Sequence, residues 1–419
     1  MAGKTGIAIC AVLVLCCGCE KGQVQTSTVD LHVSGARTDC TDVPVCAAIE
    51  LPAQLAQLGD GEISVAVRQR DGQGMDVPGQ IVTAEDGKRQ LWWVIPRTMA
   101  GAESDWTAAL SPAKKTNTGE FSWEDKAGEY LDLLFAGRKV TRYMYAYDDS
   151  TPEQRELTYK PYHHVFDAAG QDFITKGPGG LYTHHRGLFI GWHDLRFDDK
   201  KYDFWAMTGG WRDTLPTVQV HKSFTDRKSG PVLARSMSSI DWNDDSGKTI
   251  VSEQRQVTAY RCSGDTIALL DFDISLTAVG GDVFLEGDPE HGGFQYRAHN
   301  DVAADEKSHE GKAMYLFHRE VTDPEKDKNL PWAALSYPLK DKYYSVQHMD
   351  HTDNPNPTLY SAYRGYGRFG PFFSSRIGAG ETLRVHYRVW IGQGQMPKRE
   401  DMAARYLVYE GPPSAVAVR

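Results

Sequence analysis

The chain has 419 residues and a formal net charge of −10, without a long run of basic residues. A chain of this length can bury a large core and is typically divided into two or three domains. The acidic balance argues against nucleic acid as a partner. Forty glycines, twenty prolines and 11% aromatic residues favour a β-rich protein with many turns, and the aromatic rings suit sugars.

The first residues are typical of an export signal. Lys4 precedes an apolar stretch, residues 7–15, which is too short to span a bilayer. The cysteines and glycine at 16–19 resemble a bacterial lipobox. We therefore expect residues 1–19 to be a lipoprotein signal peptide and Cys19 to carry the lipid.

This interpretation places the protein in the cell envelope, anchored by lipid to a bacterial membrane and facing the periplasm or the cell surface. Cys17 stays open as the lipidated residue, and so does an ordinary cleaved signal peptide. Residues 20–38 are then expected to be a tether, and no other stretch is apolar enough to cross a membrane.

Three cysteines remain beyond the signal. Cys40 and Cys46 lie close together in TDCTDVPVC and are expected to form a small-loop disulfide in an oxidising compartment. Cys262 is then unpaired and is expected to be a small buried residue.

The chain is predicted to be all-β. Residues 39–115 contain two strand-like segments, ISVAVRQR and RQLWWVIP, and are interpreted as a small N-terminal β-sandwich domain. Residues 121–396 are predicted to form a large antiparallel β-sandwich, because apolar and polar residues alternate cleanly in IALLDFDISLTAV and in LRVHYRVWI. Residues 397–419 are predicted to be a C-terminal helix and tail.

The most informative segment is Tyr182–Asp194, YTHHRGLFIGWHD, where imidazoles and an arginine lie between apolar residues and glycines. Imidazole transfers protons near neutral pH and binds metals. On a strand, His184 and Arg186 would point to one side and His185 to the other, so one histidine of the pair would face a pocket. Trp205 follows nearby.

A second polar group follows in Phe284–Asn300. Gln295, Arg297 and His299 alternate with apolar residues and would share one face of a strand, where they suit sugar hydroxyls or a carboxylate. A solvated outer face is the alternative. His291 lies in the glycine-rich loop before this strand, where catalytic groups are often found.

A third polar group lies in a loop shaped by Asn-Pro-Asn-Pro within Gln347–Gly370. A segment this rich in polar groups is costly to bury without a partner, so we expect a ligand-facing rim, with a plain surface loop as the alternative. Its candidate residues are Asp350, His351, Asn354, Asn356, Tyr363, Arg364 and Tyr366.

The segments GLYTHHRGLFIGW, DFWAMTGG and DHTDNPNPTLYSAYRGYG resemble the PmoA-like family of uncharacterised exported bacterial proteins, which occur in planctomycetes and related bacteria. The resemblance covers roughly residues 130–394 by motif order. It implies a β-sandwich like that of galactose mutarotases, and it brings no established set of catalytic residues.

The leading functional hypothesis is a carbohydrate-active protein that uses acid–base chemistry in mutarotation, hydrolysis or β-elimination. All three reactions need a base, an acid and groups that hold hydroxyls or a uronate. The candidate catalytic residues are His185, His291, Asp350, His351 and Tyr366. The candidate sugar-binding residues are His184, Arg186, Trp205, Gln295, Arg297, Asn356 and Arg364.

Two alternatives remain open. A non-catalytic glycan-binding lipoprotein would use the same arginines and aromatic rings without an acid–base pair. A metal-dependent enzyme would use His184 or His185 with His193, Asp203 or His221, and such mixed ligands suit zinc or iron. No tight histidine spacing supports a metal, so no cofactor is expected, although a metal stays open. The three polar segments are expected to converge on one groove.

Overall fold

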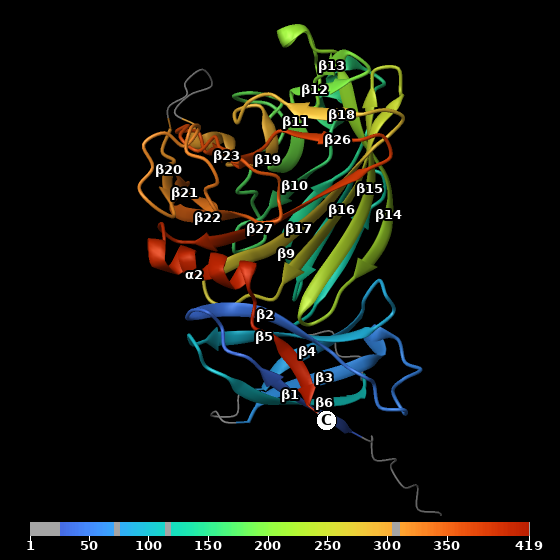
Figure 1. The fold of residues 1–419 in the computed structure, drawn as a ribbon, viewed down its shortest axis with the longest axis vertical. Helices are drawn as coiled ribbons and strands as arrows, with labels where there is room; N and C mark the ends of the chain where they lie inside the picture. The colour runs from blue at the N-terminus through green and yellow to red at the C-terminus, as the bar shows by residue number, and fades with distance from the viewer. Residues whose placement is uncertain (1–25, 71–75, 114–118, 304–310, 419) are drawn as a thin grey trace, which may run out of the picture.

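The structure is a computed structural model that describes residues 26–70, 76–113, 119–303 and 311–418. It consists mainly of antiparallel strands, and the all-β prediction is confirmed. Figure 1 shows a smaller strand body beneath a larger one, with a helix near the junction. The α-helices among the described residues are α1 (Pro152–Thr158) and α2 (Arg399–Glu410), with single 3-10 turns at Asp60–Glu62, Trp211–Asp213 and Asn300–Val302.

The smaller body is a seven-stranded sheet with its own apolar core, in the order β2-β5-β4-β3-β6-β1-β28. Its strands are β1 (Ser27–Val33), β2 (Cys40–Ala48), β3 (Ile63–Gln69), β4 (Asp76–Thr83), β5 (Arg89–Thr98), β6 (Ser104–Pro112) and β28 (Ala415–Val418). Along β3, Ile63, Val65 and Val67 are buried in alternation with exposed residues, as the sequence pattern predicts.

Two boundaries differ from the predicted ones. Ser27–Val33 is a strand paired with β6 along its whole length, so it is not part of a tether. Ala415–Val418 pairs with β1, so the last strand returns to the smaller body instead of forming a free tail. Ser27–Val33 alternates apolar and polar residues only briefly, and Ala415–Val418 is a run of 4 apolar residues, so neither signal was strong enough to predict a strand.

The predicted disulfide is also corrected. Cys40 begins the extended strand β2 and Cys46 lies further along the same strand, and the structure has Cys40, Cys46 and Cys262 as free thiols. Six residues of strand span about 20 Å. A disulfide needs Cα atoms about 4.4–6.8 Å apart, so these two cysteines are too distant to pair.

The larger body is a sandwich of two main sheets. The first has the order β14-β15-β16-β17-β27-β22-β21-β20. Its strands are β14 (Thr217–Lys228), β15 (Leu233–Asp244), β16 (Thr249–Tyr260), β17 (Thr266–Ala278), β27 (Thr382–Gln393), β22 (Lys342–Asp350), β21 (Trp332–Leu339) and β20 (Met314–Phe317).

The second main sheet has the order β24-β19-β11-β10-β9-β8-β7. Its strands are β24 (Arg368–Phe369), β19 (Gly292–Arg297), β11 (Leu188–Trp192), β10 (Tyr162–Val165), β9 (Arg138–Met144), β8 (Tyr130–Phe135) and β7 (Phe121–Lys126). Two small sheets complete the body: β13 (Lys200–Tyr202), β12 (Asp194–Phe197), β18 (Val283–Glu286) and β26 (Ser375–Ile377), and the pair β23 (Leu359–Tyr360) and β25 (Pro371–Phe372).

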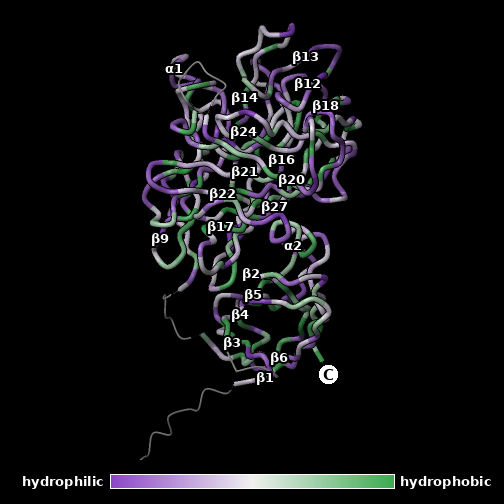
Figure 2. The backbone as a smooth tube through the Cα atoms, turned by 90° about the vertical axis from the view of Figure 1, so that its left-hand side faces the viewer, coloured by the Kyte–Doolittle hydropathy of each residue, from purple (hydrophilic) through white to green (hydrophobic). Residues whose placement is uncertain are grey.

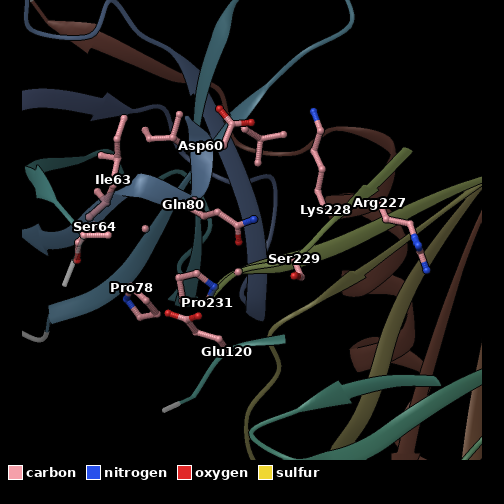
Figure 3. A pocket seen from close by; sticks show the side chains of 17 residues that line it. Asp60, Ile63, Ser64, Pro78, Gln80, Glu120, Arg227, Lys228, Ser229 and Pro231 are labelled. Carbon is pink, nitrogen blue, oxygen red and sulfur yellow. The ribbon is translucent and has the colours of Figure 1, made fainter. Parts of the chain in front are cut away.

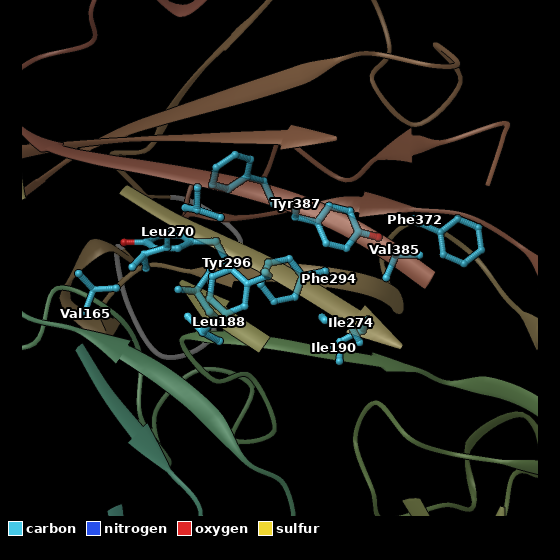
Figure 4. Packing of buried hydrophobic residues seen from close by; sticks show 14 of the residues in the cluster. Val165, Leu188, Ile190, Leu270, Ile274, Phe294, Tyr296, Phe372, Val385 and Tyr387 are labelled. Atoms are coloured by element: carbon cyan, nitrogen blue, oxygen red, sulfur yellow. The ribbon is translucent and has the colours of Figure 1, made fainter. Parts of the chain in front are cut away.

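The core of the larger body lies between the two main sheets (Figure 4). Phe294 of β19 has its ring centroid 4.7 Å from that of Phe272 on β17 and 5.1 Å from that of Tyr387 on β27. Figure 2 shows hydrophobic and hydrophilic residues alternating along the strands of both bodies. Since neighbouring residues of a strand point to opposite faces, burying Phe294 and Tyr296 in this core sends Gln295 and Arg297 to the outer face of β19.

The outer face of the larger main sheet is only partly exposed to solvent. Asp271 and Asp273 of β17 pair with Arg388 and His386 of β27, each at 2.6 Å. Beyond them, Met402 of helix α2 is buried in an apolar cluster that includes residues of both bodies. The helix thus covers polar strand positions on the outer face of this sheet, and the Arg388 guanidinium carbon lies 4.8 Å from the centroid of the Tyr409 ring. No helix among the described residues is long and apolar enough to cross a membrane.

Candidate functional site

His184 and His185 lie in a turn just before β11, not on a strand as predicted. The backbone N–H of His185 donates to the carbonyl of Tyr182 at 2.9 Å, and Tyr182 has a positive φ of 54°. A turn removes the strict alternation of a strand. Both rings therefore lie together, with centroids 4.6 Å apart and edge to face.

Aromatic rings from three segments surround His185. The ring centroids of Tyr182, Trp205 and Tyr366 lie 5.1, 6.0 and 6.1 Å from the His185 ring. His185, Trp205 and Tyr366 are buried, whereas Tyr182 and His184 are half-buried. We call these five residues the histidine cluster. It has a buried floor and a partly open rim.

Glycine explains how Trp205 reaches the cluster. The backbone of Phe204 crosses β11 at Gly191, and a Cβ atom at Gly191 would lie 1.9 Å from the Phe204 carbonyl oxygen. The Phe204 N–H donates to Trp192 at 2.9 Å, while the Asp203 carboxylate accepts N–H groups of the same turn. This close approach lays Trp205 against Phe189 on the outer face of β11, with centroids 4.8 Å apart.

Arginines from the outer sheet face join the cluster. Arg297 of β19 lies opposite Arg368 of β24, and its guanidinium carbon is 4.6 Å from the centroid of the Tyr366 ring. Arg368 donates to Ser361 Oγ at 2.6 Å and to the Glu290 carbonyl. The predicted meeting of the Tyr182 segment with the Arg297 strand is therefore present in the structure.

The rim of the cluster is polar and half-buried. The Glu290 carboxylate accepts hydrogen bonds from Arg364, at 2.9 Å from Nε, and from the Tyr363 hydroxyl. Beside it, His291 Nδ1 lies 2.7 Å from the Asp288 carboxylate. The His291 ring is 4.7 Å from that of Trp211, which is 47% exposed and gives the site an aromatic ring facing solvent.

Burial sets the charge of the imidazoles. It lowers the pKa values of His184 and His185 well below the ordinary value, and nearby cations lower them further. Both rings are therefore neutral at pH 7. Burial also lowers the pKa of Lys176 to about 7 and that of Arg297 to about 10.

Several buried polar atoms on the floor have no hydrogen-bond partner within the described ranges. They are His185 Nδ1, Trp205 Nε1, Gln295 Oε1, Arg297 Nε and Nη2, and Arg368 Nε. An unpartnered buried polar atom costs about 1–3 kcal/mol. These are donors and acceptors that a bound ligand would satisfy.

Other candidates lie elsewhere, so the expected single groove is corrected. Asp350, at the end of β22, accepts a hydrogen bond from Asn354 at 2.6 Å, and Asn354 also bonds to the backbone of His386 on β27. These bonds fasten the loop to the larger main sheet, whereas the histidine cluster lies on the outer face of the other sheet.

His351 and Asn356 share this placement. The His351 ring packs against Tyr409 of α2 at 5.3 Å, and Asn356 donates to the carbonyl of Asn354 at 3.3 Å. His299 caps a 3-10 turn after β19 ends, so it does not continue the strand face. Arg186 is buried beneath Thr183 and donates to backbone carbonyls, including that of Glu156 at 2.8 Å.

The candidate metal ligands are dispersed. The Asp203 carboxylate accepts backbone N–H groups of its own turn, and His221 packs with Tyr145 and Phe224 at 4.7 and 4.5 Å. His193 is buried with Nδ1 2.9 Å from the Asp194 carboxylate. Within the described part of the chain, no group of three or more histidine, cysteine or acidic residues is placed to hold a metal ion.

Sequence reasoning missed two residues of this site, Lys160 and Lys176, which are buried near it. Glu290, in the glycine-rich loop before β19, organises its rim. Lys160 is the one lysine of the largely apolar and aromatic segment YKPYHHV, and this contrast could have indicated a buried lysine. Lys176 had no comparable signal.

A pocket of about 430 Å³ lies away from the cluster, between the two bodies (Figure 3). Two of its polar side chains already have partners: the Asp60 carboxylate accepts from Thr83 and Arg89 within the smaller body, and Gln80 Oε1 accepts the N–H groups of Val232 and Leu233. The Gln80 bonds join the two bodies. We therefore favour the histidine cluster as the functional site.

The chain matches the model of a family of unknown function, DUF6807, over residues 130–406. The match spans the histidine cluster and nearly all of the larger body. No curated protein matches the chain. Because the match covers more than half of the sequence, the chain belongs to the DUF6807 family of unknown function.

Proposed function

We propose that this protein acts on a glycan by proton transfer at the histidine cluster. The observation that carries the proposal is His185, a buried and neutral imidazole whose Nδ1 has no partner among the described residues, enclosed by aromatic rings. A neutral imidazole can take a proton from a substrate as a general base, and the burial and nearby cations that lower its pKa weaken it as a base until a ligand changes these surroundings.

The surrounding rings suit a sugar. Aromatic side chains offer flat apolar faces with polar edges, and Trp205, Trp211 and Tyr182 supply them from the floor to the rim. Gln295, Arg297 and Arg364 supply donors and acceptors for hydroxyl groups. A binding site for small ligands typically combines such an apolar lining with a few converging polar groups.

The acid and base roles divide among the cluster residues. His185 is the base, and the Tyr366 hydroxyl, on a ring 6.1 Å from the imidazole, is the acid. His291, held by the Asp288 carboxylate at 2.7 Å, is a second proton-transfer group at the rim. Asp350, His351 and Asn356 have no part in this proposal, because they lie on another sheet.

The cellular location of the protein is also part of the proposal. The lipobox-like segment supports an exported protein held in the cell envelope through Cys19, and the motif order supports a relation to the PmoA-like proteins. Both Cys19 and the signal segment lie outside the described residues.

The test is a screen of the purified chain, lacking residues 1–19, against a glycan panel. Reducing ends, unsaturated uronates and anomer interconversion report the three reaction types. His185→Ala should lower turnover about 10²–10⁴-fold. His32→Ala, in the smaller body, is the matched control and should keep full turnover. Binding without turnover would make the protein a glycan-binding lipoprotein, and a fully active His185→Ala would end the proposed acid–base role.

A further inference from the structure

One edge of the Arg297 side chain is unused. Its Nη1 donates to the Ala298 carbonyl at 2.7 Å and to the Tyr366 carbonyl, and its flat face lies over the Tyr366 ring. The Nε and Nη2 atoms, which form the other edge of the guanidinium group, have no hydrogen-bond partner among the described residues. The side chain is nonetheless fully buried.

The same edge binds carboxylates elsewhere in this chain. Arg68, Arg142 and Arg388 each donate from Nε and Nη2 to the two oxygens of one aspartate, at 2.6 and 2.8 Å. Guanidinium and carboxylate groups match in this side-on geometry, which provides two parallel charge-assisted hydrogen bonds. The free edge of Arg297 has the shape and charge that complement a carboxylate.

The charge around Arg297 also favours a bound anion. Arg186 and Arg297 are buried cations, and within the described ranges neither forms an ion pair with a carboxylate; the buried Lys160 and Lys176 form none either, and burial lowers the pKa of both, that of Lys176 to about 7. Lys160 and Lys176 donate to backbone carbonyls instead. A buried cation without an anion is costly, so a bound anion would stabilise this arrangement.

The nearest acidic group of the rim is already engaged. The Glu290 carboxylate is bonded by Arg364 and Tyr363 and lies 3.7 Å from Arg368 Nη2. Arg368, opposite Arg297, has its own Nε without a partner in the described structure. Glu290 therefore occupies neither the Nε–Nη2 edge of Arg297 nor the Nε atom of Arg368.

We propose that the ligand of the histidine cluster is an acidic sugar whose carboxylate binds the Nε–Nη2 edge of Arg297. The sugar part of this inference rests on the proposed function, and the carboxylate part rests on Arg297. A uronide is thus the expected substrate class, and a neutral sugar of the same size leaves the buried cations unmatched.

The test uses the wild-type chain without residues 1–19 and isothermal titration calorimetry. The probes are short oligomers of galacturonate and glucuronate, the methyl esters of the same oligomers, and a sulfated neutral oligosaccharide. The acids should bind at least about tenfold more tightly than their esters, because only the free acid accepts both charge-assisted bonds. Equal binding of acid and ester would overturn the inference, and so would binding of the sulfated sugar alone.

Variants test the role of Arg297 itself. Arg297→Lys keeps the charge and loses the paired edge, and it should weaken uronide binding about tenfold to a hundredfold without changing ester binding. Arg384→Lys, at an exposed position of β27, is the matched control. The wild-type acid-to-ester ratio decides the inference even if Arg297→Lys fails to fold. Turnover of neutral sugars alone would support the proposed function and contradict the inference that the ligand carries a carboxylate. If no sugar of the panel binds, both the proposed function and this inference are wrong.

Discussion

Replacing Asp350 by asparagine should stabilise the protein, and more so at alkaline pH. Burial raises the pKa of this carboxyl from 3.8 to about 7, although Asn354 donates to it at 2.6 Å. The folded state therefore holds the proton up to about pH 7, whereas the unfolded chain releases it near its ordinary value. The contribution of this group to stability is present below about pH 4 and is lost as the pH rises to 7. The raised pKa of Asp350 therefore lowers the unfolding free energy by about 4 kcal/mol at pH 8 relative to acid pH, and about 2 kcal/mol of this loss has already occurred at pH 5.

The assay is urea unfolding followed by tryptophan fluorescence between pH 5 and 8. The gain in unfolding free energy of Asp350→Asn over wild type should grow by about 2–3 kcal/mol across this range. Asp273→Asn is a control of opposite sign, because Asp273 pairs with His386 at 2.6 Å and raises the pKa of that imidazole. It should destabilise the fold, most at pH 5. A pH-independent difference for Asp350→Asn would refute the reasoning, since it would mean that the carboxyl ionises in the fold as it does in water.

Three further predictions concern packing, thiols and export. Gly191→Ala should lower the unfolding free energy by about 1–3 kcal/mol and weaken glycan binding, because its Cβ would meet the Phe204 carbonyl oxygen and displace Trp205. The control Gly61→Ala, which has open space around it, should leave the unfolding free energy nearly unchanged. Equal effects of the two substitutions in urea unfolding would contradict the close approach of Phe204 to Gly191. Alkylation of the chain lacking residues 1–19, in denaturant without reductant, should label Cys40, Cys46 and Cys262. If mass spectrometry finds only one labelled thiol, Cys40 and Cys46 are disulfide-bonded after all. Mass spectrometry of the native N-terminus should find a lipid on Cys19, and an unmodified start downstream of it would exclude the anchor.

Much of the fold was predictable because burial of one sheet face leaves a period of two in the sequence. Residues 270–276 show it plainly, and the structure buries their apolar members in the sandwich core. The same pattern was present in TDCTDVPVCAA, where Val43, Val45 and Ala47 are buried. Reading it there would have placed Cys40 and Cys46 on one strand and excluded their pairing.

The candidate site was predictable only in part. The polar groups of Tyr182–Asp194 and of β19 stood out against apolar neighbours, and they do meet. The turn at His184 and His185 depends on a positive φ at Tyr182, a conformation that tyrosine rarely adopts and that its sequence does not announce. Which part of the Gln347–Gly370 loop reaches the cluster depends on long-range pairing of β19 with β24, which no local pattern encodes.

The most direct test of the account is a crystal structure of the wild-type chain with the uronide that binds best. The account predicts the sugar against Trp205 and Tyr182, its carboxylate on the Nε and Nη2 atoms of Arg297, and one of its exchangeable protons or C–H groups facing His185 Nδ1. A uronide bound in the pocket between Asp60 and Arg227, or on any surface away from the histidine cluster, would contradict it.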